Sequence, residues 1–342
     1  MKKLLSAILC IAMTATLVAC GSQTSPDASG DTASETKIVL KVAAQGADNS
    51  HEIETLNNFA ALASEYSNGT VEVQVFSNGS LGSLTDMIEG VTLGTIEMCF
   101  AGIGNLQQIC PDFAAYDQWM YGGAEDIIAV YNSEIGQSLN QKLIDTAATR
   151  LLSYCNCTSG RMYLWSSTPL KTMDDYKNLT LRVPGNKSIA TALAAIGKTA
   201  QVGFGDMYTA AQTGMIDVGS ADIATMISAG YDEVFPYCNE ITPNYMPLAL
   251  VVSESVYQSM SEDQQQALTK AAVEACTYWD THQDELKAEA MEMLEDSKSQ
   301  LVEMEPAELE KMNDLIHNAI ADYLSTSVDP NTIAQIREIV GK

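Results

Sequence analysis

Two hydrophobic periods alternate along the first third of the chain. Residues 37–44 are rich in β-branched and apolar side chains, and residues 70–76 alternate polar with apolar, so both segments predict β-strands. Residues 51–67 carry apolar side chains at helical spacing, and residues 84–93 predict a second helix. Residues 96–101 predict a third strand. This order of strands and helices predicts βαβ units and a largely parallel sheet.

The same alternation continues in the second part of the chain. Four strands are predicted at residues 150–154, 161–165, 179–183 and 247–253, with helices at residues 189–196 and 206–213. The longest helical pattern begins after Ser261, a capping residue followed by two acids that suit the positive end of the helix dipole. It has no glycine or proline as far as about residue 300, which predicts a helix of about 40 residues and about 60 Å. Such a helix can cross two domains; two helices joined by a kink are the alternative.

The amino terminus has the pattern of an export signal. Lys2 and Lys3 precede an apolar run over residues 4–18, which is shorter than the ~20 apolar residues that span a bilayer. Ala19-Cys20 follows this run, and a small residue before a cysteine resembles a bacterial lipoprotein processing site. We therefore expect residues 1–19 to be a signal peptide and Cys20 to carry lipid that anchors the protein outside the cytoplasm. An ordinary secretory signal with a chance cysteine is the alternative.

Residues 20–36 are the expected link between this anchor and the folded body. After Cys20 they include no aromatic residue and no aliphatic residue larger than alanine. Such a segment cannot bury enough surface to offset the entropy of ordering it, which predicts a flexible tether. The folded body begins near Lys37 and is about 300 residues long, a length that usually forms two domains.

The chain is strongly acidic, with 44 aspartates and glutamates, 18 lysines and arginines, and a formal net charge of −26. Loss of Lys2 and Lys3 with the leader leaves about 16 basic residues and a net charge near −28. A surface this acidic repels phosphate backbones, which excludes nucleic acid as a partner. No second apolar run approaches transmembrane length, so attachment to the membrane rests on the lipid.

Six cysteines remain after the leader and Cys20: Cys99, Cys110, Cys155, Cys157, Cys238 and Cys276. An even number outside the cytoplasm is compatible with three disulfides. However, the chain is long enough to fold without them, and their neighbours are apolar, which suits reduced cysteines packed as small hydrophobes. We therefore favour free, buried thiols. No zinc or other metal site is expected, because Cys155-x-Cys157 lacks a second pair and the three histidines have no metal-ligand spacing.

Catalytic and cofactor motifs are missing from the sequence. It contains neither G-x-S-x-G nor G-x-x-x-x-G-K-[ST], and Gly102-Ile103-Gly104 lacks the third glycine of a dinucleotide-binding loop. We therefore expect no catalytic residue, no cofactor and no enzymatic activity. An extracellular hydrolase or isomerase built around a cleft, and an adhesin without one, remain as alternatives of other classes.

Three blocks of sequence carry a resemblance to a known family. The first spans residues 75–98 and includes VFSNGSLGS and LGTIEM. The second contains Gly160-Arg161, Pro169 eight residues after that arginine, and the strand end LTLRVP with Arg182. The third, FGDMYTAAQTGMID at residues 204–217, resembles the pattern F-x-E-x-Y-x-A-L-Q-x-G-x-x-D. With these blocks the chain resembles the substrate-binding subunits of tripartite ATP-independent periplasmic (TRAP) transporters, the DctP-like family, from residue 41 to about residue 338.

This resemblance implies an α/β fold, a two-lobed clamp of the periplasmic-binding-protein type with a long helix that crosses both lobes. It implies a first lobe of residues 37–158 with 248–287, and a second of residues 159–247 with 288–342. It also implies that the protein captures a small carboxylate-containing solute, often an organic acid, and delivers it to the membrane subunits of an ion-driven TRAP transporter. A solute receptor for another importer or for a sensor system is the alternative.

Two arginines match the family's ligand-binding positions. The resemblance implies that Arg182 makes a bidentate contact with the ligand carboxylate, because a guanidinium offers a rigid fork of donors that fits two carboxylate oxygens. Arg161 matches the second arginine of the family. A surface ion pair for Arg182 and an ion pair between lobes for Arg161 are the alternatives.

Four further positions are candidate ligand contacts. Phe204 occupies the family's aromatic position and Tyr245 matches a tyrosine that offers its hydroxyl; core packing and hinge packing are their alternatives. Gln45 follows the first strand, either as a polar contact or as a turn residue. The asparagine that commonly holds the ligand is replaced by Ala221, and Asp222 stands where a proline is common. If Asp222 faces the site, it disfavours a second acidic group and favours an amine, hydroxyls or a cation; a helix N-cap is the alternative.

Overall fold

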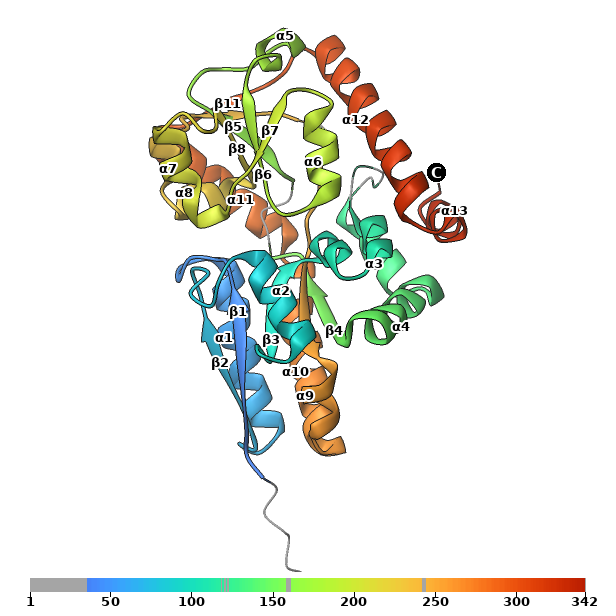
Figure 1. Cartoon of the computed structure of the whole chain (residues 1–342). Helices are drawn as coiled ribbons and strands as arrows, with labels where there is room; N and C mark the ends of the chain where they lie inside the picture. The colour runs from blue at the N-terminus through green and yellow to red at the C-terminus, as the bar shows by residue number, and fades with distance from the viewer. Residues whose placement is uncertain are drawn as a thin grey trace, which may run out of the picture. The chain divides into compact units, whose positions relative to one another are not determined.

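The structure is a computed structural model that describes residues 36–117, 119, 121, 123–157, 161–241 and 244–341. These residues form one unit with two mixed β-sheets. The expected leader, Cys20 and the tether up to residue 35 lie outside the described residues. Figure 1 shows each sheet in a lobe of its own, with helices on both of its faces.

The first sheet has the strand order β2-β1-β3-β10-β4. Its strands are β1 (Ile38–Ala44), β2 (Val71–Phe76), β3 (Met98–Gly102), β4 (Thr149–Cys155) and β10 (Leu248–Ser253). β1 runs parallel to β2 and β3, as the sequence predicts, whereas β10 is antiparallel to both β3 and β4. The expectation of a largely parallel sheet therefore needs correction at β10, which enters this lobe from the other one.

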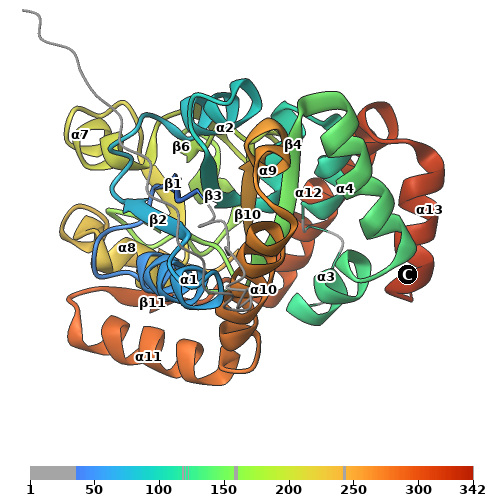
Figure 2. The same ribbon diagram turned by 90° about the horizontal axis from the view of Figure 1, so that it is seen from below.

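Alternate residues of these strands face two separate cores. Leu40, Val42 and Phe100 pack against α1 (His51–Tyr66) and α10 (Glu262–Asp280), while Ala43, Cys99 and Val251 face α2 (Leu84–Leu93). Figure 2 shows α1 and α10 on one side of this sheet and α2 on the other. Ser50 caps α1 by accepting from the Ile53 amide, and Gly94 ends α2 at φ 72°, where a side chain would be strained.

The second sheet has the order β11-β9-β5-β8-β6-β7. Its strands are β5 (Tyr163–Ser166), β6 (Thr180–Val183), β7 (Lys198–Gln201), β8 (Val218–Ala221), β9 (Tyr237–Asn239) and β11 (Gln300–Val302). One face is covered by α7 (Met207–Gln212), α8 (Ile223–Ser228) and α11 (Gln283–Asp296), and the other by α6 (Lys187–Ala194) and α12 (Pro306–Ser327). The sequence did not predict β7, β8, β9 or β11, which have only three or four residues each.

The chain passes between the lobes along neighbouring segments. The segment from β4 to β5 and the segment from β9 to β10 meet in an antiparallel bridge between Arg161 and Tyr245. Beside it, the Met162 amide donates to the Asn244 carbonyl at 2.9 Å, and the Ile103 amide donates to the Pro247 carbonyl at 2.9 Å. These hydrogen bonds tie the two crossing segments to each other and to the first lobe.

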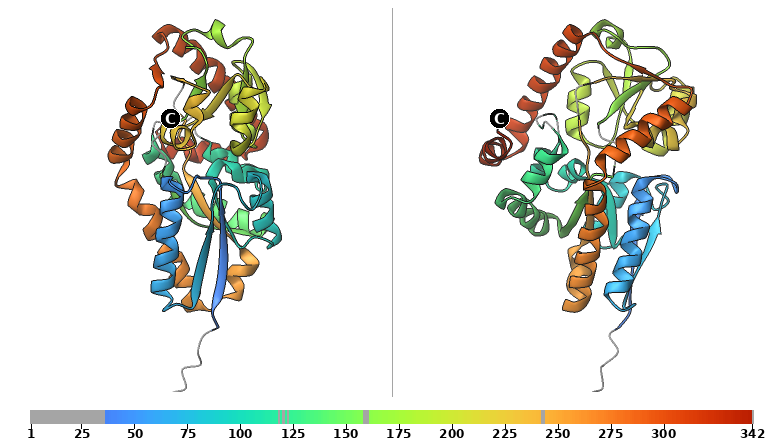
Figure 3. Two further views of the ribbon diagram at one scale, coloured as in Figure 1. Left: turned by 90° about the vertical axis from the view of Figure 1, so that its left-hand side faces the viewer. Right: turned by 180° about the vertical axis from the view of Figure 1, so that it is seen from behind.

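The predicted long helix is wrong, because the chain forms α10 and α11 with a break at Thr281 and His282. The kinked alternative is the one observed, and Figure 3 shows the change of direction. No glycine or proline marks the break, and the last carbonyls of α10 accept both the main-chain amides of Thr281 and His282 and nearby side chains. The Tyr278 carbonyl accepts from Thr281 Oγ1 at 2.8 Å, and the Trp279 carbonyl accepts from Gln283 Nε2 at 2.9 Å. α10 contacts the first lobe through α1 and β4, whereas α11 contacts α8 and β11 of the second.

The remaining helices are distributed over both lobes. They are α3 (Ala124–Tyr131), α4 (Glu134–Ala147), α5 (Met173–Tyr176), α9 (Glu254–Ser259), α12 and α13 (Pro330–Ile339). α12 packs on α5 and α6 of the second lobe, and α13 packs on α3 and α4, which follow the first lobe's β3 (Figure 3). None of the described helices is long and apolar enough to cross a membrane. The six cysteines named above are free and buried, as expected.

Candidate ligand-binding cavity

A cavity of about 610 Å³ lies between the two lobes. Its lining comes from the carboxyl ends of strands and the loops that follow them, a common place for ligands in α/β folds. Gln45 follows β1, Gly102 ends β3, Arg182 lies in β6 and Asp222 follows β8. The cavity therefore brings together four of the six predicted ligand-binding residues: Gln45, Arg182, Phe204 and Asp222.

Arg182 is the buried positive charge of this cavity, with only 6% of its surface exposed. Its Nε donates to the Val202 carbonyl at 2.9 Å and its Nη1 donates to the Ser220 carbonyl at 3.2 Å. These two bonds fix the plane of the guanidinium, while Nη2 has no hydrogen-bond partner among the described residues. No described carboxylate pairs with Arg182, and burial lowers its pKa to about 10. A guanidinium in this state is suited to bind an anion that enters the cavity.

Phe204 supplies an apolar wall next to this charge. Its ring centroid lies 5.9 Å from Cζ of Arg182 and 5.0 Å from the ring of Tyr231. The Tyr231 hydroxyl donates to the Phe204 carbonyl at 2.6 Å, which holds the short helical turn η3 (Phe204–Asp206) in place. The half-buried Phe204 ring is thus fixed where it can pack on the carbon skeleton of a ligand held by Arg182.

Glu52 is a cavity residue that the sequence analysis did not select. It lies in the first turn of α1, and its Oε1 accepts the Gln45 amide at 3.2 Å. Burial raises its pKa to about 7, against hydrogen bonds from the Gly46 and Gln45 amides that lower it, and Asp222 raises it further. Nothing in the sequence separates Glu52 from an ordinary acid at a helix start, so only the fold identifies it.

Asp222 both caps a helix and lines the cavity. Its Oδ1 accepts the Thr225 amide at 3.2 Å at the start of α8, and only 6% of its surface is exposed. The two interpretations of this residue are therefore compatible. Asp222 raises the pKa of Glu52, so the cavity holds a second carboxylate near that glutamate.

The rim of the cavity carries further acids on α11. Glu289, Glu292 and Asp296 are exposed and belong to the lining. Glu289 Oε2 lies 3.2 Å from Nε2 of His51, which links α11 to the start of α1. The described lining therefore contains five acidic side chains and only two basic ones, Arg182 and His51.

Arg161 and Tyr245 do not belong to the lining of the cavity. Arg161 Nη2 lies 2.5 Å from Glu240 Oε1, and its Nε donates to the Tyr163 hydroxyl at 3.2 Å. Tyr245 forms the β-bridge with Arg161 at the crossing of the lobes. The structure thus places both residues at the hinge, and their assignment to the ligand stays a prediction.

Two polar residues near β1 and β3 complete the inner surface. Gln45 Nε2 donates to the Gly82 carbonyl at 3.3 Å. Asn105 was not selected from the sequence, yet it lines the cavity and its Oδ1 is buried without a hydrogen-bond partner. A buried acceptor of this kind favours a ligand that brings a donor.

A second hollow, of about 820 Å³, lies on the outer face of α10. Its residues come from α10 and its neighbour α9, and its charged members Lys270 and Glu274 are exposed. Both are already engaged, since Lys270 Nζ lies 3.5 Å from the centre of the Tyr66 ring and Glu274 accepts the Tyr66 hydroxyl. The smaller cavity between the lobes, with its buried arginine, is therefore the candidate site. The described residues hold no group of three or more His, Cys, Asp or Glu side chains placed to bind a metal.

Comparison with known proteins agrees with this architecture. A solute-binding protein of Roseobacter denitrificans is 30% identical over 222 residues, 64% of this chain and 67% of that protein. The C4-dicarboxylate-binding periplasmic protein DctP of Rhodobacter capsulatus is 25% identical over 286 residues, 82% of this chain and 84% of that one.

Solved structures give the same result. A TRAP periplasmic solute-binding protein of Roseobacter denitrificans with bound L-galactonate has a TM-score of 0.79 at 26% identity, covering 90% of this chain and 99% of that one. The sugar acid binding protein DctPAm of Advenella mimigardefordensis, in complex with galactonate, has a TM-score of 0.83 at 20% identity, with the same coverage. Residues 42–326 match the model of the bacterial extracellular solute-binding proteins, family 7. The chain belongs to this family.

Proposed function

We propose that the protein captures a small carboxylate-containing ligand outside the cytoplasm and delivers it to the membrane subunits of a TRAP-type transporter. The observation that carries this proposal is the buried guanidinium of Arg182, which faces a cavity between two lobes and has no carboxylate partner among the described residues. The names of the relatives support it, since those proteins bind L-galactonate, galactonate or C4-dicarboxylates. A receptor for another importer or a sensor is the alternative, and membrane-protein genes beside this one would favour the transporter.

We further propose that Cys20 carries the lipid that holds the protein at the membrane, with residues 21–36 as its tether. The pattern of basic residues, short apolar run and Ala19-Cys20 supports this proposal. Cys20→Ser should release the protein from the membrane fraction and remove the lipid mass. Retention of that variant, together with a wild-type protein that has no lipid mass, would refute the anchor.

The lobe boundaries implied by the resemblance are part of the same proposal, and the membership of the two sheets supports them. The break between α10 and α11 favours placing the last boundary near residue 282 instead of residue 287. If the lobes close on the ligand, X-ray scattering should give a smaller radius of gyration at saturation. Identical scattering with and without a bound ligand would contradict a clamp.

The test of carboxylate capture is native mass spectrometry of the purified protein. We expect a co-purified small acid in the wild type and its loss in Arg182→Ala, with circular dichroism showing that the variant is folded. Arg182→Lys serves as the matched control, because it keeps the charge without the fork and should retain part of the ligand. A bound ligand without any acidic group would refute the proposal.

A further inference from the structure

Polar groups of both lobes meet over Gly185 in the lining of the cavity. Gly185 follows β6 three residues after Arg182, so their Cα atoms lie at most about 11 Å apart. A Cβ on Gly185 would lie 3.1 Å from Thr85 Oγ1 and 3.5 Å from Gln201 Nε2. Thr85 belongs to α2, which packs on the first sheet, and Gln201 ends β7 of the second sheet. The two side chains therefore approach each other over a residue that has no side chain of its own.

Both polar side chains are open to a ligand. Thr85 is half-buried and Gln201 is exposed, both line the cavity, and neither side chain forms a hydrogen bond with another described residue. Gly185 does not have a positive φ, so its backbone conformation does not require a glycine. What the glycine provides is the space between the hydroxyl of Thr85 and the amide of Gln201.

Asn105 supplies another unpaired amide to the same cavity. It follows β3 of the first sheet, and its side chain forms no hydrogen bond among the described residues, although its Oδ1 is buried. Its Nδ2 lies 2.8 Å from the place of a Cβ on Gly102, so here too a glycine leaves room for a polar group. Burying an amide is costly unless a partner pairs with it. Because rotation of the amide exchanges its nitrogen and oxygen, a partner that both donates and accepts suits it best, as a hydroxyl does.

The charges of the lining oppose a second acidic group on the ligand. The described basic side chains of the lining are Arg182 and His51, and His51 is paired with Glu289 at the rim. If Arg182 holds one carboxylate, a second carboxylate over Gly185 would meet only neutral side chains. Neutral groups can donate hydrogen bonds to a carboxylate but cannot balance its charge, whereas a hydroxyl brings no charge into the cavity.

We propose that Thr85 and Gln201 form a subsite over Gly185 that binds a hydroxyl group of the ligand, and that Asn105 binds a second hydroxyl. The inference rests on the proposed function, because Arg182 holds the carboxylate. It names the ligand class as hydroxylated monocarboxylic acids and assigns Thr85, Gln201 and Asn105 as specificity-determining residues. Because Thr85 and Gln201 belong to different lobes, a hydroxyl bound by both also favours the closed arrangement of the lobes.

The test compares acids that differ in their hydroxyl groups. Aldonic acids of four, five and six carbons, in all configurations, are each compared with the unsubstituted monocarboxylate and the dicarboxylate of the same chain length, by calorimetry at pH 7. In wild type, the best aldonate should bind about 100-fold more tightly than either counterpart, because hydrogen bonds to three side chains contribute about fivefold each. Equal affinities, or a preference for the unsubstituted acid or the dicarboxylate, would overturn the inference.

Variants of similar shape assign the effect to residues. Thr85→Val, Gln201→Met and Asn105→Leu each remove the polar group and should weaken the tightest aldonate by about fivefold. Gly185→Ala should weaken it as well, because the new Cβ takes the place of the hydroxyl next to Thr85 Oγ1. Thr92→Val is the matched control, since Thr92 lies on the same helix as Thr85 but outside the cavity lining, and its affinity should equal that of wild type. Unchanged affinity in all four cavity variants would overturn the assignment.

Deoxy derivatives of the tightest aldonate separate a ligand contact from a structural effect. One monodeoxy derivative, which lacks the hydroxyl bound over Gly185, should bind wild type, Thr85→Val and Gln201→Met with the same affinity, within about twofold. A different derivative should do so for wild type and Asn105→Leu. A variant that loses the same factor for every derivative acts through the fold, and this result for all three would contradict the subsite.

The outcomes separate this inference from the proposed function. If acids without hydroxyls bind as well as the aldonates and all lose affinity in Arg182→Ala, the carboxylate receptor stands and the hydroxyl subsite is refuted. If no probe binds wild type, the subsite is refuted as well, and the function is then judged by the co-purified acid alone. An aldonate that binds wild type and folded Arg182→Ala equally well would refute both.

Discussion

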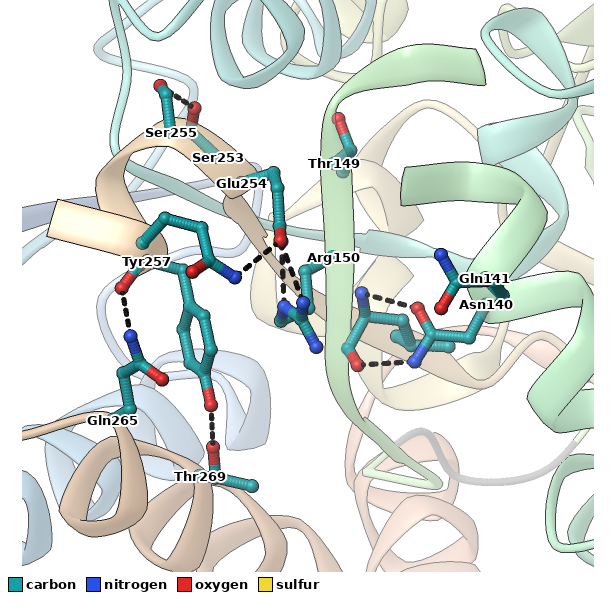
Figure 4. Close-up of polar contacts among 12 residues, drawn as sticks. Asn140, Gln141, Thr149, Arg150, Ser253, Glu254, Ser255, Tyr257, Gln265 and Thr269 are labelled. Atoms are coloured by element: carbon teal, nitrogen blue, oxygen red, sulfur yellow. Dashed lines mark hydrogen bonds and ion pairs between the residues drawn. The ribbon is translucent and has the colours of Figure 1, made fainter. Parts of the chain in front are cut away.

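Arg150 in β4 and Arg182 in β6 lie on strands of the two sheets but meet opposite surroundings. Arg150 donates from Nε and Nη2 to the two oxygens of Glu254, at 2.7 and 2.8 Å, and its guanidinium lies 4.5 Å from the centre of the Tyr257 ring (Figure 4). These hydrogen bonds raise its pKa. Arg182 donates only to two main-chain carbonyls, and burial lowers its pKa to about 10. The guanidinium of Arg150 is thus paired with a carboxylate of the protein, whereas the guanidinium of Arg182 has no carboxylate partner among the described residues.

The contrast shows how a structural arginine differs from a binding one. Arg150 has its own carboxylate, supplied by the residue after β10, and therefore joins β4 to α9. Arg182 has the same donors, but its Nε and Nη1 donate to the carbonyls of Val202 and Ser220. These two bonds leave Nη2 for a ligand in the cavity that Arg182 lines. Substituting Arg182 should therefore lower ligand affinity, whereas substituting Arg150 should lower the stability of the fold.

The largest effect is expected for Arg182→Ala. A ligand carboxylate left without its partner in a desolvated site costs roughly 3–5 kcal/mol. Affinity for the co-purified acid should therefore fall by about 100-fold to several-thousand-fold. Arg182→Lys should recover only part of the loss, because one ammonium cannot replace the fork. Calorimetry measures both, and near-wild-type affinity of folded Arg182→Ala would refute the carboxylate clamp.

Arg150→Ala should give the opposite result. It removes two charge-assisted hydrogen bonds at a pair whose side chains are 26% and 17% exposed. We expect a loss of about 1–3 kcal/mol in the free energy of unfolding, seen as a melting temperature lower by a few degrees. Ligand affinity should stay within about twofold of wild type, because the pair lies outside the cavity lining. A large loss of affinity with normal stability would erase the distinction between the two arginines.

Sequence patterns predicted the elements that make up the frame of the site. β1, α1, β2 and α2 were placed to within a residue or so at their ends, because each buries one face and has a clear cap or turn, such as Ser50 or Gly94. A continuous helix was the prediction and the break at Thr281 and His282 only its alternative, since no glycine or proline marks the break. Hydrogen bonds of side chains are found there instead, from Thr281 Oγ1 to the Tyr278 carbonyl and from Trp279 Nε1 to Thr55 Oγ1. Short strands such as β9 depend on neighbours distant in sequence, and periodicity cannot show them.

The site itself was predictable only where a motif exists. Arg182, Phe204 and Asp222 lie in blocks that resemble the family, and the fold brings all three to the cavity. Glu52 and Asn105 carry no motif; they become recognisable when α1 and β3 are placed opposite β6 and β8. Arg161 fits the spacing of the family, yet its partner Glu240 and its place at the crossing segments are properties of the fold.

Arg161→Ala sharpens the comparison, because Arg161 resembles Arg150 in its pairing and Arg182 in its motif. Its carboxylate partner is present, and the residue lies at the hinge. We therefore expect a loss of affinity of about tenfold or less, through an altered balance between open and closed lobes. The double variant Arg161→Ala/Glu240→Gln should recover part of it, because it leaves no unpaired carboxylate. A loss as large as that of Arg182→Ala would instead show direct ligand contact.

The smallest effect concerns Glu254 and acid. Burial alone would raise the pKa of Glu254, but hydrogen bonds from Arg150 and Gln258 outweigh it and hold the pKa below the ordinary value. A lowered folded-state pKa stabilises the fold above the unfolded-state pKa, about 4.3 for glutamate, and this stabilisation is lost as the pH falls through the folded value. Wild type should therefore lose its advantage over Glu254→Gln between about pH 4 and the lower folded-state pKa, by about 1 kcal/mol or less because the pair is partly exposed. Urea unfolding of both proteins from pH 7 to pH 3 measures this difference. Ligand affinity at pH 7 should be the same for wild type and Glu254→Gln, because the pair of Arg150 and Glu254 lies outside the cavity lining. A difference in the free energy of unfolding that does not change with pH would show that the pair acts by packing and not by charge.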